Sequence, residues 1–206
     1  MQNSFKTPRR RQFATAAASV LALASASSFA AVAIVHGVVG GAYSSLASAV
    51  PSVYAGATVC FDLNGNGVCD PGEPATTSSS NGSFKLSSPT LAPLVAQIGS
   101  SATNNGNAIT GRYVFRANVA QIQAATKHPM LAATVNLTPL STEIAVAIEN
   151  QGITVNSAIV ELARHIGVAT ASNVLLPPTQ VTHAGDQAAM VKESVIAQGR
   201  LALAAK

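Results

Sequence analysis

The feature that most constrains the fold is the stretch DLNGNGVCDPGE at residues 62–73. Side chains that carry oxygen atoms stand at its first, third, fifth, ninth and twelfth positions, which are Asp62, Asn64, Asn66, Asp70 and Glu73. Gly67 at the sixth position permits a sharp bend, and Val68 at the seventh offers a backbone carbonyl. This is the ligand spacing of an EF-hand loop, in which alternate side chains converge on one Ca²⁺ ion. We therefore expect these six residues to be metal ligands.

The expected ion is Ca²⁺, which accepts six to eight hard oxygen ligands, whereas Mg²⁺ requires a stricter octahedron. Since the loop has only three carboxylates, we expect weak binding, with a Kd on the order of 10⁻⁴–10⁻³ M. The loop is also expected in a β context, because GATVCF before it is strand-like and Pro71 and Pro74 after it disfavour a helix. The alternative interpretation is an Asn- and Gly-rich turn that joins two strands.

The two cysteines of the chain, Cys60 and Cys69, lie just before the loop and inside it. In an oxidising compartment, a lone pair this close in sequence most simply forms one disulfide. The alternative is a pair of reduced, buried thiols.

Residues 1–33 are typical of an export signal peptide. The positively charged KTPRRRQF precedes an apolar run that is too short and too rich in Ala and Ser for a membrane span. Small residues offer two cleavage sites, at Ala31 and Ala33 or at Ser28 and Ala30. The twin arginine at 10–11 leaves both the Sec and the Tat route open. We expect a soluble mature protein without a stable membrane span, located in the periplasm, at the cell surface or outside the cell; a membrane-anchoring helix is the alternative.

The net charge of +4 does not indicate a nucleic-acid partner. Four of the twelve basic residues, Lys6 and those at 9–11, precede any acidic residue, and the remaining eight balance the eight acidic ones. A protein that binds nucleic acid needs a basic patch to neutralise phosphates. The expected partners are therefore calcium and a protein or cell-surface component.

The rest of the chain predicts an α+β fold. Residues 34–98 read as an antiparallel β-sandwich module, in which VAIVHGVV is expected to pair with GATVCFDL and residues 41–55 to form a long connection. The polar, Gly-rich segment 99–111 is expected to be a linker. Residues 112–206 are expected to form a second unit with strands RYVFRA and AATVNL and about three helices.

Two of these helices have clear boundary signals. Thr138 is expected to cap the first helix, which stops at Gly152, and Thr154 the second, which stops at Gly167. The segment from Ala184 onward predicts a third.

Residues 35–86 resemble bacterial surface modules of the SdrD B-like and Cna B-type, or carboxypeptidase-regulatory-like, class. The residues in register with that pattern are Gly56, Ala57, Val59, Asp62, Asn64, Asn66, Gly67, Asp70, Gly72, Glu73, Pro74, Gly82, Phe84 and Leu86. The resemblance implies a prealbumin-like β-sandwich whose calcium site is carried by the loop. TPLSTEIAVAIENQG resembles segments that follow such modules in exported proteins, some of which continue into an esterase or phosphatase domain.

No catalytic motif accompanies these features in the sequence: a nucleophile elbow, a zinc-protease HExxH and a phosphate-binding Gly loop are all absent. His183 and Asp186 stand three residues apart, but Asp186 is better explained as a helix cap, and Arg112 and Arg116 as partners of acids. We therefore expect an exported, non-enzymatic calcium-binding protein with an interaction or adhesion role. The alternative is an accessory region of an exported hydrolase whose catalytic domain lies outside this chain.

Overall fold

The computed structural model describes residues 32–44, 48–126 and 132–204. The predicted signal peptide therefore lies almost wholly outside the described residues. Across the described part, no helix combines the length and apolarity needed to cross a membrane. In the described residues the fold is mixed α+β, as predicted, with mainly antiparallel sheets and four α-helices.

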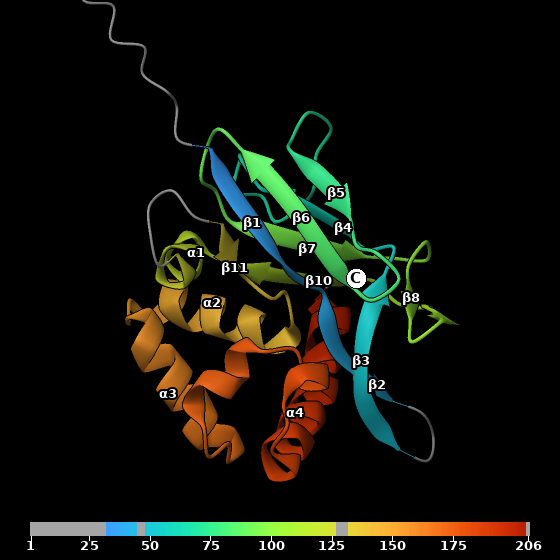
Figure 1. The fold of residues 1–206 in the computed structure, drawn as a ribbon, viewed down its shortest axis with the longest axis vertical. Coiled ribbons are helices and arrows are strands. Elements are labelled where there is room, and N and C mark those ends of the chain that lie inside the picture. The colour runs from blue at the N-terminus through green and yellow to red at the C-terminus, as the bar shows by residue number, and fades with distance from the viewer. Residues whose placement is uncertain (1–31, 45–47, 127–131, 205–206) are drawn as a thin grey trace, which may run out of the picture.

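Figure 1 shows the helices gathered at one end of the strands. The strands are β1 (Ala33–Val38), β2 (Gly40–Ser44), β3 (Ala49–Ala55), β4 (Thr58–Phe61), β5 (Ala75–Thr77), β6 (Ser83–Ser88), β7 (Leu94–Ile98), β8 (Thr103–Asn104), β9 (Asn107–Ala108), β10 (Tyr113–Ala117) and β11 (Ala133–Thr134). The helices are α1 (Val119–Ala125), α2 (Pro139–Gln151), α3 (Val155–Ile166) and α4 (Ala184–Ala204), with short 3₁₀ helices η1 (Ala171–Leu175) and η2 (Pro178–Gln180).

The strands form three sheets, with the orders β11–β1–β6, β10–β7–β4–β5 and β2–β3–β8–β9. β1 and β6 cross in front of β4, β7 and β10 (Figure 1). One hydrophobic core contains side chains from all three sheets, among them Val35, Tyr54, Val59 and Phe115. This arrangement is compatible with a sandwich-like fold.

The predicted pairing of the VAIVHGVV and GATVCFDL strands is wrong. β1 pairs with β6, from Ala33 opposite Ser88 to Val38 opposite Ser83, while β4 lies between β5 and β7. Ala57, Val59 and Phe61, at alternate positions of the second segment, all lie in the core, but such a pattern shows only which face of a strand is buried and not which strand is its partner. Because β1 and β4 bury their faces in one core from different sheets, they face each other instead of pairing.

Residues 41–55 also differ from the expected irregular connection, because most of them form the β2–β3 hairpin. Small residues here allow close packing of other elements. A Cβ on Gly40 would lie 2.7 Å from Pro177, and one on Gly41 would lie 2.6 Å from the Gln198 amide nitrogen.

The segment 99–111 does not separate two sets of strands. It carries the β8–β9 hairpin, and β8 pairs with the end of β3. On either side of it, β7 and β10 pair antiparallel, from Leu94 opposite Ala117 to Ile98 opposite Tyr113. The strands before and after the expected linker therefore share one sheet.

The helix boundaries agree with the sequence signals. The Thr138 hydroxyl accepts a hydrogen bond from the backbone N–H of Ser141, and Gly152 ends α2 in the left-handed conformation, with φ 65°. α3 has the same arrangement, with Thr154 as N-cap and Gly167 as C-cap. Each such cap typically adds about 1 kcal/mol. α1 was not predicted; its capping box joins Asn118 and Gln121.

Candidate metal centre

The loop 62–73 connects β4 to β5, and its two ends are tied to the sheet by backbone hydrogen bonds. The N–H of Phe61 donates to the Pro74 carbonyl at 3.0 Å, and the N–H of Asp62 donates to the Pro93 carbonyl at 2.9 Å. Gly67 has a φ of 77°, and nothing else lies within 4 Å of the position of a Cβ there. Backbone conformation, and not lack of space, thus explains the glycine at the sixth position.

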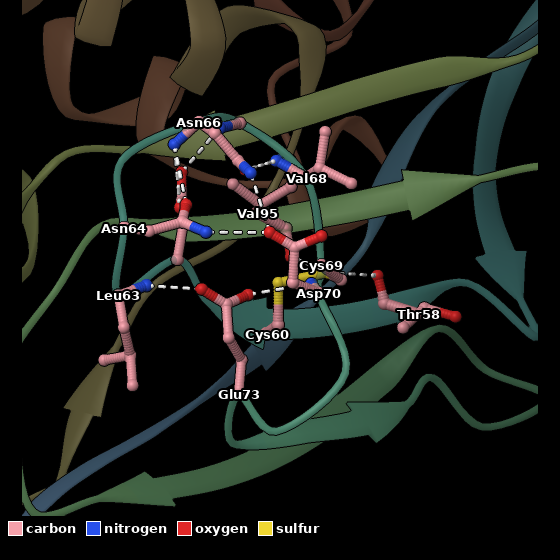
Figure 2. Close-up of a disulfide and its surroundings, with 12 residues drawn as sticks. Thr58, Cys60, Leu63, Asn64, Asn66, Val68, Cys69, Asp70, Glu73 and Val95 are labelled. Carbon is pink, nitrogen blue, oxygen red and sulfur yellow. Dashed lines mark hydrogen bonds between the residues drawn. A yellow bond between two sulfur atoms is a disulfide. The ribbon is translucent and has the colours of Figure 1, made fainter.

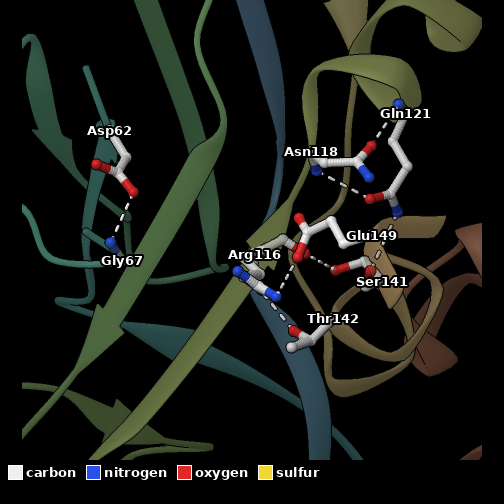
Figure 3. A network of polar contacts seen from close by, with 8 residues as sticks. All are labelled: Asp62, Gly67, Arg116, Asn118, Gln121, Ser141, Thr142 and Glu149. Carbon is white, nitrogen blue, oxygen red and sulfur yellow. Dashed lines mark hydrogen bonds and ion pairs between the residues drawn. The ribbon is translucent and has the colours of Figure 1, made fainter. Parts of the chain in front are cut away.

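Asp62, the first predicted ligand, is the most buried of the set, with 3% of its surface exposed. Its carboxylate accepts two hydrogen bonds from the loop backbone, from the N–H of Gly67 at 2.7 Å and of Asn66 at 3.1 Å (Figure 3 shows the first). These bonds curl the first half of the loop around the carboxylate. The Asp62 side chain is therefore held in a fixed place by the turn that follows it.

Glu73, the last predicted ligand, reaches back across the loop (Figure 2). One carboxylate oxygen accepts from the N–H of Leu63 at 2.7 Å, and the other accepts from the N–H of Asp70 at 3.0 Å. The carboxylate at the twelfth position therefore faces the first residues of the loop, which is the position that ring closure around an ion requires.

Between these ends, the two asparagines turn toward Asp70 (Figure 2). The amide nitrogens of Asn64 and Asn66 both donate to the same oxygen of Asp70, each at 2.7 Å. These hydrogen bonds, from Asn64 first and from Asn66 second, lower the pKa of Asp70. The Asn66 oxygen in turn accepts from the N–H of Val68 at 2.8 Å.

The five predicted side chains thus lie in one loop, and its carboxylates have no basic partner among the residues that the structure describes. The ion pairs among the described residues join Arg116 to Glu149, Arg200 to Glu143 and Glu193, and His183 to Asp186. Within the described part of the chain, no three His, Cys, Asp or Glu side chains are grouped as metal ligands are. The donor set here is mixed, with amide and carbonyl oxygens beside the carboxylates, and all of its donors are hard oxygens that suit Ca²⁺. To contribute their oxygens, Asn64 and Asn66 would have to turn their amides away from Asp70.

The predicted disulfide is present. Cys60 on β4 and Cys69 in the loop are joined, with their Cα atoms 5.6 Å apart. Cys60 is fully buried in the sheet. The bond therefore fixes the eighth loop position, between Val68 and Asp70, to a rigid strand (Figure 2).

Arg116 pairs with an acid, as expected, and its strand is also tied to α2 by polar contacts (Figure 3). The Arg116 N–H donates to the Thr142 hydroxyl at 3.0 Å, and the Ser141 hydroxyl donates to the Arg116 carbonyl at 3.0 Å. The Gln121 amide on α1 donates to the Ser141 carbonyl at 3.1 Å. These contacts join the sheet to the helices, and no sequence motif indicates them because the partners are far apart along the chain.

Asp186 does not cap its own helix, so that prediction is wrong. It lies in the first turn of α4, almost fully buried, and accepts hydrogen bonds from the N–H of Ala169 at 2.9 Å, the N–H of Thr170 at 3.2 Å and the Asn173 amide at 2.9 Å. The His183 ring lies 3.1 Å from it and is largely exposed. Asp186 thus anchors α4 to the segment after α3.

An Asp186→Asn variant should melt several degrees lower than the wild type. The NH₂ group of asparagine would face one of the N–H donors that bind a carboxylate oxygen in the wild type, and two donors cannot form a hydrogen bond with each other. The backbone hydrogen bond from Ala169, with those from Thr170, Asn173 and His183, lowers the pKa of Asp186 from 3.8 to about 2. A lowered pKa gives stability that is present above pH 3.8 and is lost as the pH falls through about 2. Urea unfolding midpoints at pH 2 to 6 check this; the same acid dependence in the variant would contradict it.

No protein-family model matches the chain, and no curated protein and no solved structure shows significant similarity to it.

Proposed function

We propose that residues 62–73 form a structural Ca²⁺ site in an exported, non-enzymatic protein. The observation that carries this proposal is the arrangement of Asp62 and Glu73 at the two ends of the loop. Both carboxylates are oriented by backbone N–H groups of the loop itself, and no basic side chain in the described part of the chain neutralises them. Carboxylates at both ends of one loop, left without a basic partner among the described residues, are available to a cation.

The chain's own residues would hold the ion with the carboxylates of Asp62, Asp70 and Glu73, the amide oxygens of Asn64 and Asn66 and the carbonyl of Val68. The bound Ca²⁺ would supply charge neutralisation and would cross-link the loop. An ion that binds only the folded form stabilises it by RT ln(1 + [L]/Kd). The proposed role of the ion is therefore to stiffen the connection between β4 and β5.

An exported location is supported by the disulfide, since such bonds persist in oxidising compartments, and by the charged and apolar N-terminal sequence. We propose that the protein acts through a protein or cell-surface partner in the periplasm or outside the cell. The resemblance of residues 35–86 to SdrD B-like surface modules supports the same role.

Thermal unfolding in EDTA, in 10 mM Mg²⁺ and in 10 mM Ca²⁺ tests the site. Ca²⁺ should raise the Tm by roughly 3–10 °C, as expected for a Kd on the order of 10⁻⁴–10⁻³ M in a protein of this size. Mg²⁺ should have a smaller effect. Glu73→Gln and Asp62→Asn should abolish the Ca²⁺ shift, since each removes one charge while keeping an oxygen.

The matched control is Glu161→Gln, which removes an exposed carboxylate on α3 outside the loop and should keep the full Ca²⁺ shift. Equal melting curves in EDTA and in Ca²⁺ would show that the loop is an Asn- and Gly-rich turn and not a Ca²⁺ site.

A further inference from the structure

Four buried polar atoms have no hydrogen-bond partner within the described residues. They are Ser52 Oγ on β3, Asn104 Oδ1 on β8, and Ser194 Oγ and Gln198 Nε2 on α4. All four side chains are between 0 and 8% exposed. A buried polar atom that has lost its hydration without a replacement partner is costly, so such atoms are rare in folded proteins. Four of them on elements that pack together require an explanation.

The strand register places two of these groups, Ser52 and Asn104, on one face of a sheet together with Tyr54. Ser52 and Tyr54 are two residues apart on β3, so their side chains point to the same face. Asn104 lies directly opposite Tyr54, and Gly41 lies directly opposite Ser52. Directly opposite residues of an antiparallel pair share a face. The side chains of Ser52, Tyr54 and Asn104 therefore line one surface, with a glycine beside them.

α4 covers this surface and brings the Gln198 amide to it. A Cβ on Gly41 would lie 2.6 Å from Gln198 Nε2 and 3.2 Å from the Tyr54 ring, so the amide lies directly over the glycine. Burial raises the pKa of the Tyr54 hydroxyl, and Tyr113 adds to this, while the nearby side chains of Asn104 and Gln198 lower it. The Tyr54 hydroxyl therefore lies close to both amides.

Ser194 belongs to the same face of α4 as Gln198, because residues four apart in a helix lie one above the other. It is fully buried, like Ser52 on the facing strand. The unpaired set thus consists of one amide donor, one amide acceptor and two hydroxyls that can do either. All are neutral, so they suit a small neutral hydrogen-bonding molecule better than an ion.

We propose that ordered water binds between α4 and the β2–β3–β8 sheet, at the polar cluster formed by Ser52, Asn104, Ser194 and Gln198. Water accepts from Gln198 Nε2 and donates to Asn104 Oδ1, and the two serine hydroxyls complete its contacts. A buried water typically makes about three hydrogen bonds to groups that are otherwise unsatisfied. Through this water, the docking of α4 on the sheet depends on polar contacts as well as on its apolar residues.

Oxygen-17 relaxation dispersion, which counts long-lived internal waters, tests the proposal in the wild type and in the Gln198→Leu and Ser52→Ala variants. Each variant should lose at least one long-lived water and melt roughly 2–6 °C lower, because the remaining groups lose their bridge. Lys192→Ala, an exposed change on α4, should alter neither quantity. An unchanged water count, or a Tm that rises when the polar group is removed, would overturn the proposal.

The double variant supplies a second, independent readout. If one water bridges β3 and α4, the losses in Tm from Ser52→Ala and Gln198→Leu should be clearly less than additive, since either change already removes the shared bridge. Additive losses would show that the two groups have separate partners and would also overturn the proposal. Ser52→Ala is small enough to keep the fold if Gln198→Leu does not.

Discussion

Replacing Phe115 with alanine should lower the free energy of unfolding by roughly 3–5 kcal/mol, in a single cooperative transition of the whole protein. Phe115 lies on β10, fully buried, and its ring meets that of Tyr54 edge-on, with the centroids 5.5 Å apart. It also lies opposite Ala96 of β7. The side chain therefore joins strands from before and after residues 99–111, and its removal leaves a cavity in a core that both parts share.

Urea unfolding followed by tyrosine fluorescence and by far-UV circular dichroism checks this, since the chain has no Trp. Tyr54 and Tyr113 adjoin Phe115 and report the core, whereas the dichroism is dominated by the helices. Val160→Ala, on an exposed position of α3, is the matched control and should change the unfolding free energy little. Two separate transitions, with only one displaced by Phe115→Ala, would support the division into two units that the sequence suggested.

The helices were predictable because their signals are local. A cap such as Thr138 and a stop such as Gly152 act within one turn of the residue that carries them. α1 carries a similar signal in Asn118 and Gln121, but at seven residues it offers too short a periodic pattern to be identified. A search for capping-box residues next to short apolar runs would have identified α1.

Strand partners were not predictable because pairing is non-local. The β-branched sequence of β1 fits a place beside β4 as well as one beside β6, and only the shared core decides between them. The prediction that residues 99–111 are a linker failed for a related reason. Their polar, Gly-rich composition marks a turn, and a turn between β7 and β10 looks the same in sequence as a linker between domains.

That residues 62–73 form a loop between two strands was predicted correctly, since the placement of glycine, proline and polar residues is a local property. The disulfide was predictable for the same reason. The polar cluster of Ser52, Asn104, Ser194 and Gln198 was not, because its members come from three elements and carry no common spacing. Only the packing of α4 on the sheet reveals it.

Removing the disulfide should produce the second large effect, a loss of roughly 2–3 kcal/mol in the free energy of unfolding, as expected for a cross-link between residues nine apart. A Cys60→Ala, Cys69→Ala variant and the wild type reduced by dithiothreitol should show the same loss. In the reduction, dithiothreitol is oxidised to its cyclic disulfide and the protein gains two thiols. Chemical unfolding with and without reductant measures the difference. An oxidised protein no more stable than the variant would contradict a structural role for the bond.

The same bond should control Ca²⁺ affinity if the proposed site is correct, because Cys69 stands between Val68 and Asp70 and is pinned to β4. Freed from that strand, the loop must be ordered by the ion alone, so reduction should weaken Ca²⁺ binding about fivefold or more. Binding linkage is reciprocal, so saturating Ca²⁺ should make the disulfide harder to reduce by the same factor, about 20 mV for a two-electron couple. Calorimetric titration of both redox forms and a dithiothreitol redox titration with and without Ca²⁺ measure the two sides of this cycle. Equal Ca²⁺ affinities in the two redox forms would show that the disulfide stabilises the fold without shaping the site. If neither form binds Ca²⁺, the proposed site is wrong, but the predicted loss of unfolding free energy on removal of the disulfide still stands.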